Sequence, residues 1–189
     1  GGGGVVLESH AAVLVPPLLH ASVVHGNMAD GASPSGRGGG VRIVGNGTAV
    51  ITGGTTIVGN FADVGGGLFA DTYTSVSGSI APEHFIARGD THQFFNVSSC
   101  EAAVAGGGIS LSFGTRVSDA HVDSCSSQSG GGVYVLPGNV VAGPASTSAP
   151  AALAASTVQS CTSTAAGGGV YVDTASLLHV ESTRVEDCI

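Results

Sequence analysis

The chain has 189 residues, a formal net charge of −8 and 10% charged residues, which include five arginines and no lysine. This composition argues against a nucleic-acid partner and a polybasic membrane anchor, because both need clustered basic side chains. Chemistry that needs a lysine amine, such as Schiff-base formation or a phosphate-binding P-loop, is excluded. The longest purely apolar run, residues 11–19, is too short for a membrane span and contains Pro16-Pro17.

Glycine triplets recur along the chain, and each precedes a short apolar alternation. An alternation of period two is typical of a half-buried strand. Successive triplets are 24 to 41 residues apart, within the range of solenoids, propellers and repeat arrays. In chain order the triplets with their alternations are residues 2–7, 38–43, 65–70, 106–111, 130–135 and 167–172.

A second phrase, Val-x-x-Cys, precedes most of the later triplets. It occupies residues 97–100, 122–125, 158–161 and 185–188, and residues 57–60 are a version with Ile first and Asn last. From the last residue of the phrase to the next triplet is five or six residues each time. Because two independent signatures keep this interval, we predict that they belong to one structural repeat.

The repeat has a basic length of about 24 residues, with insertions near 27–37, 71–93 and 136–155, where turn-forming and low-complexity residues gather. A unit of this size holds about three short strands joined by turns. The residues after each triplet predict two interior ladders. One contains Val41, Leu68, Ile109, Val133 and Val170, and the other contains Ile43, Ala70, Leu111, Val135 and Val172.

We therefore predict an all-β fold, a right-handed parallel β-helix (solenoid) of about six coils with loop insertions. Residues 1–189 form a single segment, expected to be a fragment of a longer solenoid. The alternative is a set of antiparallel hairpins in a sandwich or propeller. That fold predicts Asn-Gly or Asp-Gly turns between strands, and only Asn46-Gly47 and Asp30-Gly31 qualify.

The combined phrase, an apolar residue, two variable residues, Asn or Cys and then Gly-Gly-Gly, resembles the repeats of chlamydial polymorphic outer membrane proteins. It is also similar to the wider class of pectate-lyase-like β-helix repeats in bacterial adhesins and in algal or protist surface proteins. The resemblance covers residues 38–189, with Cys in place of Asn in four of five slots. It implies an extracellular or cell-surface filament or adhesin module and implies no activity.

The four cysteines occupy one equivalent slot of the repeat, so a stacked solenoid places them in one column. Neighbouring strands lie about 4.8 Å apart, which is within the Cα separation that a disulfide bridges. One hypothesis is a pair of cross-coil disulfides, Cys100 with Cys125 and Cys161 with Cys188. The other hypothesis is four free thiols that act as small buried residues.

Two short motifs concern the surface. Asn46 and Asn96 each begin an N-glycosylation sequon, and Asn46 is the better candidate because it lies in a predicted turn. Arg88, Gly89 and Asp90 spell an integrin-recognition tripeptide within the longest insertion. Tripeptides of this kind arise often by chance, so we favour an ordinary solvent-exposed turn over an adhesion motif here.

A polar patch is the only candidate for chemistry. Asp119, His121 and Asp123 alternate along one strand, so we expect them to share its outward face. Alignment of the repeats places Arg184 in the column of His121 and Glu186 in the column of Asp123. Polysaccharide-cleaving enzymes use exposed carboxylate clusters, but these columns mix acidic, basic and neutral residues, which favours a solvated polar face.

The sequence thus predicts an extracellular structural or adhesive module, a rigid scaffold or filament component without catalysis. The alternative is a polysaccharide-binding or polysaccharide-cleaving β-helix protein. We expect no cofactor and no metal. The expected partners are other protein chains or further coils of the same protein, with glycans as a further possibility, and the pattern predicts neither nucleic-acid binding nor a membrane span.

Overall fold

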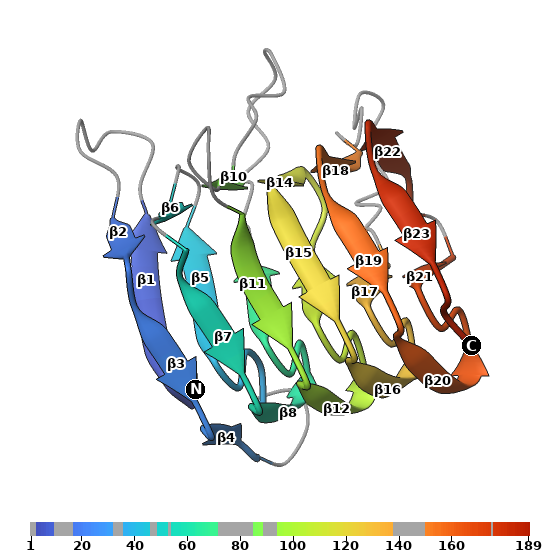
Figure 1. Ribbon diagram of the computed structural model, residues 1–189, viewed down its shortest axis with the longest axis horizontal. Helices are drawn as coiled ribbons and strands as arrows, with labels where there is room; N and C mark the ends of the chain where they lie inside the picture. The colour runs from blue at the N-terminus through green and yellow to red at the C-terminus, as the bar shows by residue number, and fades with distance from the viewer. Residues whose placement is uncertain are drawn as a thin grey trace, which may run out of the picture.

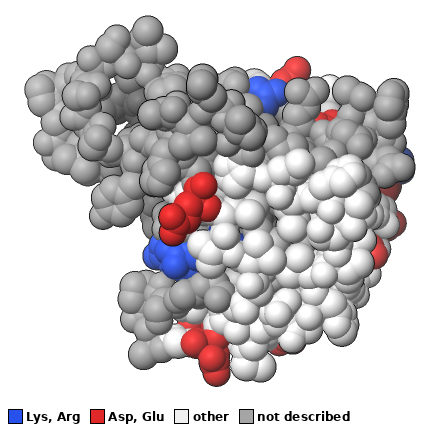
Figure 2. All heavy atoms as spheres, turned by 90° about the vertical axis from the view of Figure 1, so that its left-hand side faces the viewer, with Lys and Arg blue, Asp and Glu red and all other residues white. Residues whose placement is uncertain are grey.

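The structure is a computed structural model that describes residues 3–9, 17–31, 36–45, 49–52, 54–71, 85–88, 94–137, 150–174 and 176–189. Within these ranges the chain is all-β, without helices, and the strand pairs of its sheets are parallel. The strands lie side by side along the long axis, with the first and last strands at opposite ends (Figure 1). Among the described residues that are visible at the end that carries the first strands, most of the surface is uncharged and a few acidic and basic groups stand out (Figure 2). This stacking is consistent with a parallel β-solenoid.

The chain passes through four strand positions in a fixed order, and strands at the same position form a sheet. Sheet I contains β1 (Val5–Ser9), β5 (Val41–Gly45), β9 (Leu68–Asp71), β13 (Ile109–Leu111), β17 (Val133–Val135) and β21 (Val170–Val172). Position II contains the pair β2 (Leu18–His20) and β6 (Val50–Thr52), followed by the four-stranded sheet of β10 (Phe85–Arg88), β14 (Thr115–Ser118), β18 (Ala151–Ala154) and β22 (Leu178–Glu181).

The other two sheets complete each repeat. Sheet III contains β3 (Val23–His25), β7 (Thr56–Val58), β11 (Phe95–Ser98), β15 (Ala120–Asp123), β19 (Thr157–Gln159) and β23 (Arg184–Glu186). Sheet IV contains β4 (Met28–Ala29), β8 (Phe61–Val64), β12 (Glu101–Ala105), β16 (Ser126–Ser129) and β20 (Thr162–Ala166).

The prediction of three strands per repeat was wrong, because the chain uses four. Two of the corners turn at one residue in the left-handed region. Asp119, at φ 58°, is the only residue between β14 and β15, and Ser124, at φ 53°, lies with Cys125 between β15 and β16. Corners of one or two residues use less chain than a conventional four-residue turn. A repeat of 24 residues therefore accommodates a fourth strand.

The three predicted insertions also extend too far, because each includes a regular strand. Strand β4 lies within 27–37, β10 within 71–93 and β18 within 136–155. Strand β18 illustrates the reason: its sequence is Ala-Ala-Leu-Ala, which resembles the low-complexity residues before it. In the structure Ala151 and Leu153 are buried in the shared core.

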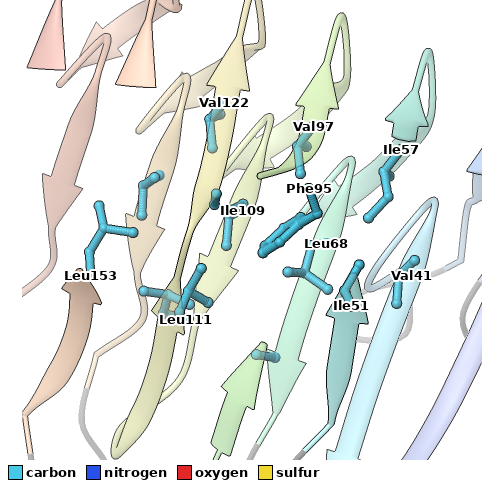
Figure 3. Close-up of a cluster of buried hydrophobic side chains, with 14 of the residues drawn as sticks. Val41, Ile51, Ile57, Leu68, Phe95, Val97, Ile109, Leu111, Val122 and Leu153 are labelled. Atoms are coloured by element: carbon cyan, nitrogen blue, oxygen red, sulfur yellow. The ribbon is translucent and has the colours of Figure 1, made fainter. Parts of the chain in front are cut away.

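The strand register confirms both predicted ladders, although the last member of the second ladder, Val172, is 38% exposed. Val41 pairs with Leu68, which pairs with Ile109, and the ladder continues through Val133 to Val170. Side chains from the facing sheets fill the same interior (Figure 3), among them Ile57, Val97 and Val122 of sheet III. The resulting core is continuous along the stack, as expected when each repeat buries its apolar face against its neighbours.

Each glycine of a triplet has a separate structural reason, as the triplet at 106–108 illustrates. Gly106 has φ 65°, a conformation that side chains disfavour. A Cβ atom on Gly107 would lie 2.2 Å from the carbonyl oxygen of Ser126. A Cβ on Gly108 would lie 2.5 Å from a methyl group of Val122 and 3.3 Å from Sγ of Cys125. The triplet and the Val-x-x-Cys phrase therefore face each other across the interior.

Candidate functional site

The four cysteines and Asn60 form one inward column at the corner between sheets III and IV; we call it the slot column. Cys100, Cys125 and Cys161 are almost fully buried, and Cys188 is partly buried at the end of the stack. In each repeat the preceding residue has a positive φ, with values of 50° at Ser99 and 51° at Ser160. This corner turns the next side chain into the interior.

The slot residue hydrogen-bonds both within and between repeats. Asn60 accepts from the backbone N–H of Asn27 at 2.8 Å and donates through Nδ2 to the carbonyl of Val24 at 2.9 Å. Cys100 donates to the carbonyl of Ile57 at 3.6 Å, which is the equivalent position one repeat later. Cysteine thus makes weaker versions of the contacts that Asn60 makes, which explains why this slot accepts either residue type.

All four cysteines are free thiols in the structure. The predicted disulfides between Cys100 and Cys125 and between Cys161 and Cys188 are therefore not observed, and the free-thiol alternative is the one found. Parallel side chains in register point the same way, a geometry that strains a disulfide. Each Sγ instead donates to the carbonyl two residues earlier, at 3.1 to 3.3 Å.

Hydrogen bonds between neighbouring thiols alter their acidity. The bond from Cys125 lowers the pKa of Cys100 to about 7, although burial acts in the opposite direction. The same contact, together with burial, raises the pKa of Cys125. Cys100 is only 1% exposed, so a reagent in solution cannot reach its thiol in the folded state.

The predicted polar patch lies on the outward face of sheet III, and its columns are as expected. His121 pairs with Thr157, which pairs with Arg184, while Asp123 pairs with Gln159 and then Glu186. The side chains of His121 and Asp123 are half-buried on the strand surface. Asp119 departs from the expectation of a shared strand, because it forms the left-handed corner before β15.

The acidic groups of this patch are held by neighbouring polar side chains. Asp119 accepts a hydrogen bond from the Ser118 hydroxyl at 2.9 Å. Asp123 accepts from Ser124 at 3.1 Å and from Nε2 of Gln159 at 3.3 Å. These contacts stabilise a polar surface. The residues that pair with His121 on the neighbouring strands are Asn96 and Thr157, and neither is an acid.

The basic members of the patch pair with acids near the end of the stack. The guanidinium group of Arg184 contacts Glu186 on the same strand, at 2.5 Å. A second ion pair joins Arg116 to Glu181 at 3.8 Å, across two repeats of position II. In each pair one side chain is mostly exposed and the other is partly buried, and such surface pairs contribute at most about 1 kcal/mol each to stability.

The structure places only part of the other predicted sites. Asn96 lies on β11 between Thr56 and His121, partly exposed on sheet III. Arg88 ends strand β10 and pairs with Ser118. Asn46, Gly89 and Asp90 lie outside the described residues.

Sequence reasoning missed a cluster on the outer face of sheet I. The rings of Tyr134 and Tyr171 stack in parallel at 5.6 Å between centroids, and the hydroxyl of Tyr134 donates to Asp173. This bond lowers the pKa of Asp173, while burial and the same carboxylate raise the pKa of Tyr134. The signal was present in the aligned Val-Tyr-Val phrases, which place both tyrosines at one outward position.

Within the described ranges, no group of three His, Cys, Asp or Glu side chains is arranged to hold a metal ion. In the same part of the chain, no helix has the length and apolar character that crossing a bilayer requires. The fold is a stack of parallel strands, and the outward face of sheet III is polar. No protein-family model, curated protein or solved structure matches the chain.

Proposed function

We propose that the chain is an extracellular structural or adhesive module, a right-handed parallel β-helix of about six coils that acts as a rigid scaffold. The observation that carries this proposal is the unbroken interior ladder from Val5 to Val170, which links all strands of sheet I in one register. Each repeat packs mainly against its neighbours, so the repeats together form one rigid stack.

The surface chemistry supports a scaffold more than a catalyst. The outward columns of sheet III vary from repeat to repeat, as in Asn96, His121, Thr157 and Arg184. An acid–base mechanism on sugars needs two carboxyl groups about 5 to 10 Å apart around one bond. Asp119 and Asp123 are instead bonded to serine and glutamine neighbours.

A high-resolution experimental structure of the purified chain tests this proposal. It should show a right-handed coil of about six turns with the interior ladder in one register. An antiparallel arrangement of hairpins, or a left-handed coil, would contradict it.

The extracellular assignment rests on the sequons and on the resemblance to surface proteins. Expression through a eukaryotic secretory pathway should attach glycans to Asn96, which lies on the partly exposed face of β11. A Ser98→Ala variant, which destroys that sequon, serves as the control for mass loss on glycosidase treatment. If the chain is secreted and folded but carries no glycan at Asn96, this sequon no longer supports the extracellular assignment.

Glycan binding is a second candidate, favoured by the stacked tyrosines and Asp173 on sheet I. Aromatic rings with an adjacent carboxylate are suited to contacting the apolar faces and hydroxyl groups of sugars. A glycan array should detect binding that is lost in Tyr171→Ala. The alternative is dismissed if neither the wild-type chain nor Tyr171→Ala binds any glycan.

A further inference from the structure

The thiols of the slot column keep one geometry from repeat to repeat. The Sγ atoms of Cys100, Cys125 and Cys188 each lie 3.6 to 3.8 Å from a carbonyl oxygen of the preceding repeat. All four sulfurs lie 3.1 to 3.3 Å from the place where a Cβ on the third glycine of the facing triplet would stand. Since each sulfur occupies the same place in its own repeat, successive sulfurs are separated by the spacing of parallel strands, about 4.8 Å.

Neighbouring thiols of the column also contact one another. Cys125 hydrogen-bonds with both Cys100 and Cys161, and Cys161 hydrogen-bonds with Cys188 as well. Asn60 lies before the first sulfur, with its Nδ2 atom 3.9 Å from Sγ of Cys100. The four thiols therefore form one row with three sulfur-to-sulfur intervals.

The length of each interval is too great for a disulfide and suits a metal bridge. Disulfide sulfurs lie about 2.05 Å apart, which is less than half of the strand spacing. A metal–thiolate bond is about 2.3 Å long for zinc. A cation of similar size midway between two sulfurs therefore spans about 4.6 Å, and it fits between repeats without a shift of the strands.

The ligands select the class of cation. Thiolates favour soft metal ions such as Cu(I). A structural zinc site needs four ligands, and in the part of the chain that the structure describes no three His, Cys, Asp or Glu side chains are grouped to hold a metal ion. Two sulfurs in a line suit a soft monovalent cation with a filled d shell, such as Cu(I) or Ag(I), because these ions form linear two-coordinate complexes.

Charge balance also favours a monovalent cation. Cys100, Cys125 and Cys161 are at most 1% exposed, and a net charge in such an interior is costly. Each monovalent cation that binds between two thiols displaces one proton to the solvent. Three cations replace three of the four thiol protons, so the bridged row is neutral and keeps one protonated thiol.

We propose that the slot column is a binding site for a row of soft monovalent cations, Cu(I) or Ag(I), with one cation between each pair of neighbouring thiols. The sulfurs supply every bond to the metal. The third glycine of each triplet keeps the space beside each sulfur free of a side chain. This site lies in the interior of the stack and is independent of the scaffold role.

Native mass spectrometry of the 189-residue chain loaded with Ag(I) tests the site. Because the interior thiols are buried, the reduced chain is unfolded in urea, mixed with excess Ag(I) and refolded by dilution. Free methionine, a competing soft ligand, then removes loosely bound silver. Circular dichroism verifies that β structure has returned. The wild-type chain should retain three silver ions, whereas four thiols that bind silver separately would retain four.

Two variants that each remove one thiol provide the matched comparison. Cys100→Asn removes the first sulfur of the row and leaves two intervals, whereas Cys125→Asn removes an interior sulfur and leaves one. We expect two silver ions in Cys100→Asn and one in Cys125→Asn, while separate thiols would give three in both. Asparagine occupies the same slot at residue 60, so both variants should fold.

X-ray absorption at the silver edge should show two sulfur neighbours for each ion in the wild-type chain. Equal silver counts in the two variants would overturn the proposal, as would silver with three or four ligands. A wild-type chain that refolds only without silver, or that refolds and retains none, would overturn it too. Zn(II) in place of Ag(I) should not be retained, and its retention would equally contradict a two-coordinate site.

Discussion

The two short corners of each repeat that turn at a left-handed residue differ in the side chains they tolerate. At the corner between sheets III and IV, the slot residue faces a glycine triplet, and backbone approaches backbone across the interior. At the corner between position II and sheet III, the inward residue varies among Ser22, Thr55, Ala120 and Ser156. At the first corner, which we call the narrow corner, the close approach of backbone atoms therefore requires glycine and a constant interval from the slot residue to the triplet. At the second corner, which we call the wider corner, different small side chains are accepted.

The largest effect should come from adding a methyl group at the narrow corner. In Gly107→Ala the new Cβ would lie 2.2 Å from the Ser126 carbonyl oxygen and 2.6 Å from that of Gly131, and neither backbone atom can move independently. We expect a loss of about 4 kcal/mol or more in the free energy of unfolding, measured by urea denaturation.

The matched control for Gly107→Ala is Gly59→Ser. Gly59 has φ 61°, and the nearest atom to its Cβ position is 3.5 Å away. Other repeats carry Ser99 and Ser124 at this place with a similar φ. Gly59→Ser should cost only about 1 to 2 kcal/mol, and equal losses in the two variants would show that close approach is not the cause.

The slot column provides a second contrast at the same corner. Cys125→Leu introduces a larger side chain next to Gly108 and should destabilise the chain by about 1 to 3 kcal/mol. Cys125→Asn introduces the amide that Asn60 carries in the same column, so its cost should remain below that of Cys125→Leu. Urea denaturation of both variants measures the difference, and a more stable leucine variant would contradict it.

The wider corner should respond more weakly. The hydroxyl of Ser156 donates to the carbonyl of Ala154 at 2.7 Å and accepts from the backbone N–H of Ala120 at 3.2 Å. Ser156→Ala leaves that N–H without this acceptor and should cost about 1 to 2 kcal/mol. Ser124→Ala, at an exposed outward residue, is the control, and thermal unfolding should distinguish the two.

The smallest effect concerns the surface pair of Tyr134 and Asp173, and it depends on pH. The folded state lowers the pKa of Asp173, so the contact stabilises above the unfolded carboxyl pKa and is lost as pH falls through the folded value. The pKa of Tyr134 is raised, so its contribution is complete below the unfolded tyrosine pKa and is lost with rising alkalinity.

A comparison of wild type with Tyr134→Phe tests this pH window. The wild-type chain should be more stable at neutral pH by less than about 1 kcal/mol. The difference should disappear below the lowered pKa of Asp173 and decline above about pH 10. Thermal unfolding of both chains from acid to alkaline pH measures it, and a constant difference would refute the assignment.

Much of the stacking could be predicted from the sequence because the narrow corner leaves a periodic signature. The fixed interval between Cys125 and Gly130 reflects direct packing, so both interior ladders followed from it. The fourth strand was missed because β16, with the sequence Ser-Ser-Gln-Ser, has no apolar alternation. Its pairing depends on the backbone, and Ser127 is buried with its hydroxyl bonded to the carbonyl of Ser129.

The polar patch was placed correctly in its columns, but its hydrogen bonds could not be foreseen. The contact of Asp123 with Gln159 joins residues 36 positions apart. The state of the cysteines was equally open, because a shared column allows both a disulfide and a thiol. Each Sγ points toward a backbone carbonyl, as in Cys161 to Gln159 at 3.1 Å. This direction depends on the backbone conformation of the corner, which the spacing of the cysteines in the sequence does not reveal.

The direction of the backbone hydrogen bonds has a mechanical consequence. Bonds such as Gly107 N–H to the Gly130 carbonyl, at 3.3 Å, join one repeat to the next, so they run along the stack and not around it. A pulling force applied to either terminus therefore acts first on the outermost repeat, which detaches strand by strand while the interior repeats remain intact. Such a chain extends in discrete steps and dissipates mechanical work at each one.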